Sequence, residues 1–258
     1  MNPEGLAIDP RSVWRVVQRN GRVWWKYKVP SLVGNLGQPL LFLVAFGFGM
    51  SQHETVAGHT YLQFIAPGLA ASAVMYSAAF EATYGSYTRL STQSTFEGIL
   101  MTPITLEELA LGEVTWGAIK GLISGLVMIG VMPLFGLWPS PWVALLPPFL
   151  FVAGILFAAL GLMMTALATN YDFFNYFVSL IITPLFLFSG IFFALDQLPY
   201  PTREILQFTP LTPVVEVSRM LCYGEPRPGW PLMAAAVTIL ALAATLLAAR
   251  LLRRRLIK

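Results

Sequence analysis

The clearest chemical feature of this sequence is a set of three ionisable side chains within long apolar stretches. Glu113 and Lys120 lie seven residues apart, on roughly one face of a helix, and Glu81 lies near the end of an earlier stretch. Lys120 is about 11 residues into its stretch, or about 16 Å along a helix. An unpaired charge at that depth of a membrane is costly, so Lys120 is expected to face the protein interior and pair with Glu113 or Glu81. The alternatives are contact with an anionic substrate or lipid headgroup, or a neutral or snorkelling ammonium.

The sequence gives little evidence for a catalytic, nucleotide-binding or metal site. The phosphate-loop motif G-x-x-x-x-G-K-[ST] does not occur, which excludes ATP binding of that kind. Cys222 is the single cysteine, so neither an internal disulfide nor a cysteine metal site can form. His53 and His59 flank Glu54 in a short loop, which is weak evidence for a metal ion. We therefore expect no catalytic residue, no metal site and no cofactor in this chain.

Composition indicates an integral membrane protein. The 258 residues are 56% hydrophobic and 11% charged, with a mean hydropathy of +0.67. About 20 apolar residues cross a bilayer as a helix. The sequence therefore predicts an all-α polytopic fold with six transmembrane helices, at Ser31–Met50, Tyr61–Thr83, Leu109–Leu134, Trp142–Ala168, Phe174–Leu195 and Trp230–Arg250.

The distribution of basic residues predicts the topology. Of the 16 Lys and Arg residues, 12 lie before the first apolar stretch, in the loop after the second, or in the tail. Only three lie in the last long loop on the other side. The positive-inside rule then places both termini in the cytoplasm. This topology also explains the basic pI without a nucleic-acid partner. We expect one domain, with an interfacial segment (1–30), a six-span bundle (31–250) and a basic tail (251–258).

The segment before the first apolar stretch predicts a helix lying in the membrane interface. Its basic residues recur at helical spacing, and its tryptophans suit headgroup depth against anionic lipid. The alternative is a basic flank that only sets orientation. The residues concerned are Arg11, Arg15, Arg19, Arg22, Trp24, Trp25 and Lys26.

The loop at 84–108, between the second and third spans, predicts a short capped helix. Ser94 with Glu97 fits a capping box, as does Thr105 with Glu108. Pro103 disfavours helical geometry at the residue before it, which limits the helix to about 95–101. A helix of two turns is not stable alone in water, so it must dock on a partner or on its own bundle.

A semi-apolar segment at 196–228 predicts two further short helices on the external side, Thr202–Phe208 and Pro213–Tyr223. Thr212 is a suitable N-cap before Pro213, and Gly224 a suitable stop. Helices this short reach membrane depth only when they are buried in protein or line a wet cavity. A re-entrant hairpin and an amphipathic surface loop both fit.

Several motifs together resemble the permease subunits of ABC-2-type exporters over nearly the whole chain. They are "YLQFIAPGL", "MTPIT", "GIFFALDQLP" and "LTPVVEVSRMLCYG". Within that family, "FEATYGSYTR", "LALGEVTW" and "ATNYDFFNYFVSLIITPLFLFSG" are most similar to the NodJ-type permeases, which export lipo-chitooligosaccharide nodulation factors.

The resemblance implies a non-catalytic transport subunit of the bacterial inner membrane. It would work with a second permease copy, most simply as a homodimer, and two separate ATPase subunits that bind ATP and Mg. An amphipathic or lipid-linked substrate would be exported; drug or polysaccharide export by the same type of permease, and an ATP-independent assembly protein, are alternatives. The short cytoplasmic helix would be the coupling helix, contacting the ATPase through Phe96, Glu97, Leu100, Met101, Thr102 and Pro103. The pathway would run between the first and fifth spans, with Phe42, Phe46, Phe188 and Phe192 as candidate lining residues.

Overall fold

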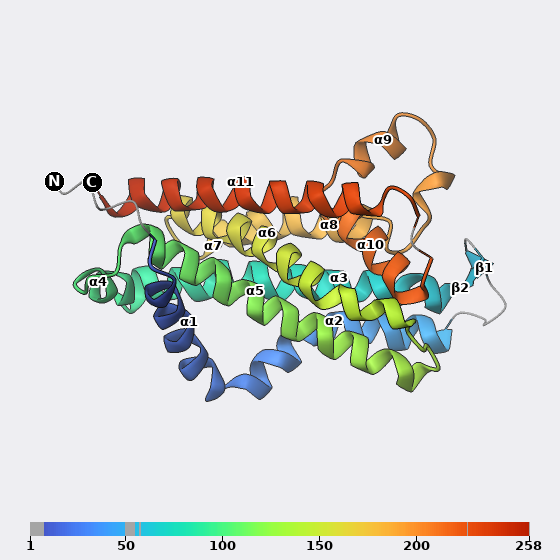
Figure 1. Cartoon of the computed structure of the whole chain (residues 1–258), viewed down its shortest axis with the longest axis horizontal. Coiled ribbons are helices and arrows are strands. Elements are labelled where there is room, and N and C mark those ends of the chain that lie inside the picture. The colour runs from blue at the N-terminus through green and yellow to red at the C-terminus, as the bar shows by residue number, and fades with distance from the viewer. Residues whose placement is uncertain (1–7, 50–54, 57, 226, 258) are drawn as a thin grey trace.

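The chain folds into a bundle of long, nearly parallel helices (Figure 1). The structure is a computed structural model that describes residues 8–49, 55–56, 58–225 and 227–257. The prediction of an all-α polytopic membrane protein is confirmed. Among the described residues, five helical segments are long and apolar enough to cross a membrane. They are built on α2 (Lys28–Gly49), α3 (Tyr61–Phe80), α5 (Leu106–Val131), α6 (Leu146–Leu167) and α11 (Trp230–Leu256).

The predicted fifth span differs from the structure in length and bounds. The helical run covers only Asp172–Phe188, as α7 (Asp172–Phe177), a π-helical turn η5 (Val178–Ile182) and α8 (Thr183–Phe188). Gly190, which follows, has the left-handed φ of 77° and turns the chain away from the helix axis. Seventeen residues extend about 25 Å, slightly less than the hydrocarbon core of a bilayer.

The second span is longer than the sequence indicates. After α3 the helix continues through two π-helical turns, η1 (Glu81–Gly85) and η2 (Thr88–Thr92), so the run covers Tyr61–Thr92. The expected loop at 84–108 is therefore wrong in its first part, which is helical. A capping box at Thr60, with Gln63, fixes the other end of this run.

Small residues on α5 bring the central helices close together. Gly117, Gly121 and Gly125 recur every four residues along one face. A Cβ atom on Gly117 would lie 2.7 Å from Ala158 on α6, and one on Gly125 would lie 2.6 Å from Val74 on α3. Close packing of this kind stabilises helix pairs in lipid, where the hydrophobic effect between helices is absent.

The bundle has two distinct ends (Figure 1). At one end lie α4 (Thr95–Leu100), the first turns of α1 (Pro10–Trp25) and the last turns of α11. We call this the α4 end. At the opposite end, which we call the α9 end, lie the strands β1 (Thr55–Val56) and β2 (His59–Thr60), with α9 (Thr202–Gln207) and α10 (Thr212–Tyr223).

The two short helices of the α9 end differ from each other. The buried face of α10 packs on α3 and α11, whereas α9 stands apart and Phe208, just after it, is 90% exposed. Gly224 ends α10 with a left-handed φ of 72°, as predicted. The predicted Thr212 N-cap is wrong, because its hydroxyl donates instead to the carbonyl of Leu206 at 2.8 Å.

The short 3-10 helices η3 (Met132–Phe135), η4 (Pro141–Leu145) and η6 (Leu195–Gln197) complete the described elements. His53 and Glu54 lie outside the described residues. His59 faces Glu225, with 3.5 Å between Nε2 and Oε2. Within the described ranges, no group of three His, Cys, Asp or Glu side chains is placed to hold a metal ion.

Candidate functional site

The short helix α4 projects from the α4 end and exposes one side. Glu97, Met101, Thr102 and Pro103 are exposed, and Met101 has 89% of its surface accessible. Leu100 is partly buried against the bundle. These five residues of the predicted coupling contact therefore lie at or near the free surface. The short helix itself ends at Leu100, one residue earlier than expected.

Phe96 does not lie on that surface. Its side chain is fully buried in the core cluster under α4, so it anchors the helix to its own chain. Burying a phenylalanine side chain contributes about 1.5–3 kcal/mol, which offsets the weak intrinsic stability of one short helix. A contact between Phe96 and another protein is thus the part of the sequence prediction that this structure contradicts.

The expected Ser94–Glu97 capping box is also absent from α4. Ser94 has a left-handed backbone, with φ 48° and ψ 27°, and makes no capping hydrogen bond. It lies one residue beyond Gln93, the C-cap of the long helical run that ends at Thr92, and a left-handed residue in this position commonly terminates a helix. The Thr105–Glu108 box at the start of α5 is present, with both reciprocal hydrogen bonds.

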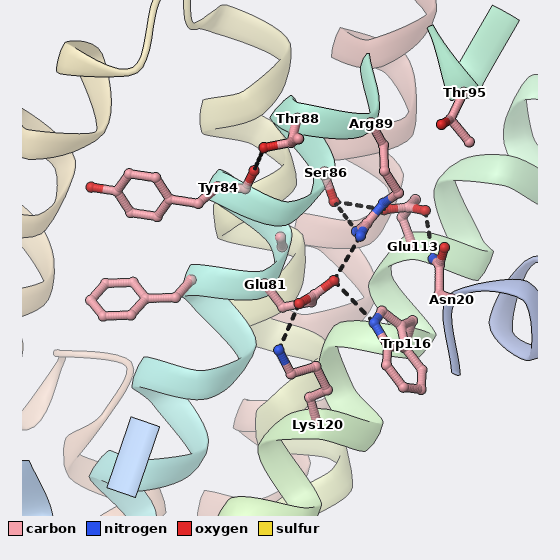
Figure 2. A network of polar contacts seen from close by, with 12 residues as sticks. Asn20, Glu81, Tyr84, Ser86, Thr88, Arg89, Thr95, Glu113, Trp116 and Lys120 are labelled. Atoms are coloured by element: carbon pink, nitrogen blue, oxygen red, sulfur yellow. Dashed lines mark hydrogen bonds and ion pairs between the residues drawn. The ribbon is translucent and has the colours of Figure 1, made fainter. Parts of the chain in front are cut away.

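Behind α4, a buried ion-pair network joins α5 to the helical run that continues α3 (Figure 2). Glu81 accepts from Lys120 Nζ at 2.7 Å and from Arg89 Nη1 at 2.8 Å. Arg89 Nη2 in turn lies 2.6 Å from Oε2 of Glu113. Two carboxylates and two cations balance in charge, and each side chain is nine-tenths or more buried.

Neutral donors satisfy the remaining carboxylate positions. Trp116 Nε1 donates to Glu81 at 3.0 Å, Ser86 Oγ donates to Glu113 at 2.6 Å, and Asn20 Nδ2 donates to Glu113 at 2.8 Å. A Cβ on Gly85 would lie 2.8 Å from a Glu81 oxygen, so glycine leaves room for the carboxylate. Buried charges are tolerated when they are paired and hydrogen-bonded in this way.

The structure brings together the three ionisable residues singled out in the sequence and adds a fourth. Lys120 pairs with Glu81, and Glu113 joins through Arg89 rather than directly. The sequence assigned Arg89 to a cytoplasmic loop; it is instead a buried member of the helix. The i, i+4, i+8 spacing of Glu81, Gly85 and Arg89 is the signal that could have placed it on the same face.

The network reaches α4 through α1. Arg19 Nη2 donates to Oγ1 of Thr95, the first residue of α4, at 3.2 Å, and Arg19 Nη1 donates to Asn20 Oδ1 at 2.9 Å. Asn20 then contacts Glu113. Burial and the nearby Arg89 guanidinium lower the pKa of Arg19. A continuous chain of hydrogen bonds thus links the base of α4 to the buried charges.

Helix α1 is tied to the bundle more firmly than an interfacial helix requires. Val16 packs on Gly112, where a Cβ would come within 2.6 Å of it. The backbone N–H of Asp9 donates to Glu108 at 2.8 Å. Trp24 is buried, with its ring centroid 6.0 Å from that of Trp116, so its side chain packs within the chain and not on the free surface.

Five other residues of the predicted interfacial set lie on the free side of α1, whereas Arg19 is turned towards Thr95 and Asn20, contrary to the expectation. Trp25 is 64% exposed, and the ammonium of Lys28 lies 3.3 Å from the centre of its ring. The basic side chains that are exposed are Arg11, Arg15, Arg22 and Lys26.

An open cavity of about 290 Å³ lies between α1 and the π-helical turns. Its lining includes Arg19, Asn20, Tyr27 and Arg89. Of the four charged residues in the network, Arg89 lines this cavity, and its side chain is still nine-tenths buried.

Aromatic residues of α2, of α8 and of the segment just after α8 form a separate cluster. The ring of Phe42 lies 5.4 Å from Phe186 and 5.5 Å from Phe192, and Phe46 stacks on Phe42 at 6.0 Å. Phe188 is half exposed, and the described ring contacts of this cluster do not include it. Three of the four predicted pathway residues are thus side by side.

Comparison with known proteins identifies the class. The family model for the ABC-2 type transporter matches residues 11–223, which is most of the chain. The chain belongs to this family and is a multi-pass transmembrane subunit of an ABC transporter.

Its similarity to individual proteins extends over nearly the full length. Nodulation protein J of Sinorhizobium fredii is 35% identical over 257 residues, covering 97% of each chain. Nodulation protein J of Bradyrhizobium diazoefficiens is 32% identical over 98% of this chain and 95% of its own. The inner membrane transport permease YadH of Escherichia coli is 25% identical over 83% of this chain and 81% of its own.

Proposed function

We propose that this chain is the permease of an ATP-driven exporter in a bacterial inner membrane, with both termini in the cytoplasm. A separate ATPase, in two copies, would bind ATP and Mg and dock on α4. A second copy of this chain would complete the pathway. The observation that carries the proposal is α4 itself, a short helix with an exposed outer side and a base joined by hydrogen bonds to buried charges.

The mechanical argument follows from that anchoring. A force applied to the exposed side at Glu97 and Met101 passes to the bundle through Phe96, which is buried, and through the bond between Thr95 and Arg19. Packed cores and satisfied ion pairs deform little, so a displacement of α4 would move the neighbouring helices as a unit. A loosely attached loop would absorb the same displacement.

Orientation follows from the basic residues. The exposed cations of α1 and of the last turns of α11 lie towards the α4 end, and the positive-inside rule places such an end in the cytoplasm. An ATPase there has access to cytoplasmic ATP.

The proposed substrate class is amphipathic or lipid-linked, such as a lipo-oligosaccharide. The aromatic cluster of Phe42, Phe46 and Phe192 supports it, because flat rings offer contact both to acyl chains and to sugar faces. Drug or polysaccharide export by the same mechanism is the second candidate.

The experiment is a pull-down of the tagged chain from native membranes in mild detergent, with ATPase activity assayed on the eluate. We expect a nucleotide-binding subunit to co-purify, and to be lost when Glu97 and Met101 are both changed to Ala. Leu134→Ala is the matched control, because Leu134 is 82% exposed and lies in η3, which follows the end of α5 opposite to α4. An eluate that contains this chain alone, in several detergents, would contradict the proposal and favour an ATP-independent membrane protein.

A further inference from the structure

A second cavity, of about 370 Å³, lies at the α9 end between α3, α9, α10 and the start of α11. Its lining includes Arg203, Arg219 and Arg227. These are the three arginines of residues 196–228, a segment that contains no lysine. The few cations that the sequence places on this side of the membrane therefore converge on one site.

Carboxylates neutralise two of the three arginines. Arg219 is mostly buried; its Nη1 lies 2.8 Å from Glu216, and its Nη2 donates to the Gly190 carbonyl at 2.9 Å. Arg203 lies 2.6 Å from Asp196, and both side chains are largely open to solvent.

Arg227 has no ion-pair partner within the described part of the chain. A further carboxylate of this end, that of Glu225, faces His59 and lines an adjoining smaller cavity, whose lining Arg227 and Arg219 share. Two carboxylates and three guanidinium groups line the larger cavity itself, which leaves it with an excess positive charge.

Much of the remaining lining is apolar, and Gln207 and Thr212 add neutral polar groups. The ring of Phe64 lies 3.8 Å from the Arg219 guanidinium, and Met220 and Met233 continue the wall. Thioether and aromatic side chains adapt to a flexible apolar chain. The cavity thus combines an apolar wall with forked cationic donors of the kind that bind phosphate and carboxylate groups.

We infer that this cavity binds the anionic group of an amphipathic molecule, a phosphate, sulfate or carboxylate, with Arg227 and Arg203 on the anion and the Phe64–Met220–Met233 wall on the adjoining chain. The inference rests on the proposed function in one respect only, which is the origin of the bound molecule. In that proposal it is an exported substrate that arrives at the external end. An anionic lipid of the outer leaflet carries the same chemistry. The experiment below needs no ATPase, so its result is independent of the pull-down.

The test measures binding of monododecyl phosphate to the full chain in neutral detergent by native mass spectrometry. We expect one bound molecule per chain, with affinity reduced about tenfold or more by Arg227→Gln, because a charge-assisted hydrogen bond is lost. Asp196→Asn should raise affinity, since it releases Arg203 to the ligand. A gain of affinity cannot result from misfolding. Arg254→Gln, which removes one exposed charge at the other end of the molecule, is the matched control and should change nothing.

Two further probes distinguish the sources of the anion. Displacement of monododecyl phosphate by phosphatidylglycerol but not by phosphatidylcholine would support the site and assign it to membrane lipid. Failure of phosphatidylglycerol to compete would support the site and assign it to the exported molecule. The inference is overturned if the wild type and Arg227→Gln bind equally, if no probe binds, or if inorganic phosphate binds as tightly as the amphiphile.

Discussion

At the α4 end of the bundle the charged side chains of the network are buried and paired, whereas at the α9 end the charges line an open cavity. Glu81, Arg89, Glu113 and Lys120 form a neutral, hydrogen-bonded set between packed helices. The arginines of the α9 end leave an excess charge beside solvent. The same residue types therefore build a rigid junction in one place and an accessible surface in the other. The difference lies in how completely each charge is satisfied.

Among the tests of this difference between the two ends, the largest effect is expected from Glu81→Gln. This change removes the carboxylate that pairs with Lys120 and leaves Arg89 paired with Glu113. Breaking a buried pair costs about 3–5 kcal/mol of unfolding free energy. We expect a large drop in the thermal unfolding midpoint in detergent.

The matched control for that change is Arg203→Gln at the α9 end. It removes an exposed ion pair with Asp196, and exposed pairs contribute about 0–1 kcal/mol. Similar losses of stability for Glu81→Gln and Arg203→Gln would show that the two ends do not differ as we describe.

A smaller effect is expected at the junction of α1 and α5. Gly112→Ala places a methyl group within 2.6 Å of Val16, and overpacking of this kind costs about 1–3 kcal/mol. It should also lower any ATPase activity stimulated by the permease, because α1 links Thr95 to the network. Gly130→Ala on the same helix meets nothing within 4 Å and is the control. Equal unfolding midpoints for the two variants would refute the tight packing of α1.

The smallest effect is expected at Ser94. Ser94→Gly relieves a left-handed conformation and should raise stability by about 1 kcal/mol or less, because glycine also gains entropy in the unfolded chain. Ser94→Ala, which removes only the hydroxyl, should leave stability nearly unchanged since no cap is lost. A large loss for Ser94→Ala would instead indicate the capping box that the sequence suggests.

Much of the architecture follows from the sequence because apolar length and local capping determine it. The Thr105 box, the stop at Gly224 and most span positions depend on neighbouring residues alone. The predicted N-caps at Ser94 and Thr212 are wrong because such side chains can hydrogen-bond to the backbone before or after them. Tertiary packing determines which of the two bonds forms.

The site was less predictable for a related reason. The pairing of Lys120 with a glutamate could be predicted from the cost of a buried charge. The sequence around Arg89 predicts a loop cation instead, because its partner Glu113 lies 24 residues away. The sequence likewise predicts Phe96 as a docking residue, because it does not reveal the core below α4 that buries this side chain. Long-range contacts determined both outcomes.

The most direct test of the central claim is site-directed cross-linking from the exposed side of α4. The one native cysteine, Cys222, is buried, so a Met101→Cys variant presents a single reactive thiol. With a thiol-to-amine cross-linker in native membranes, we predict a covalent adduct between Met101→Cys and a nucleotide-binding subunit, and none from the equally accessible Leu134→Cys. Cross-linking from Leu134→Cys alone, or from neither position while the ATPase is present, would contradict the assignment of α4 as the contact point.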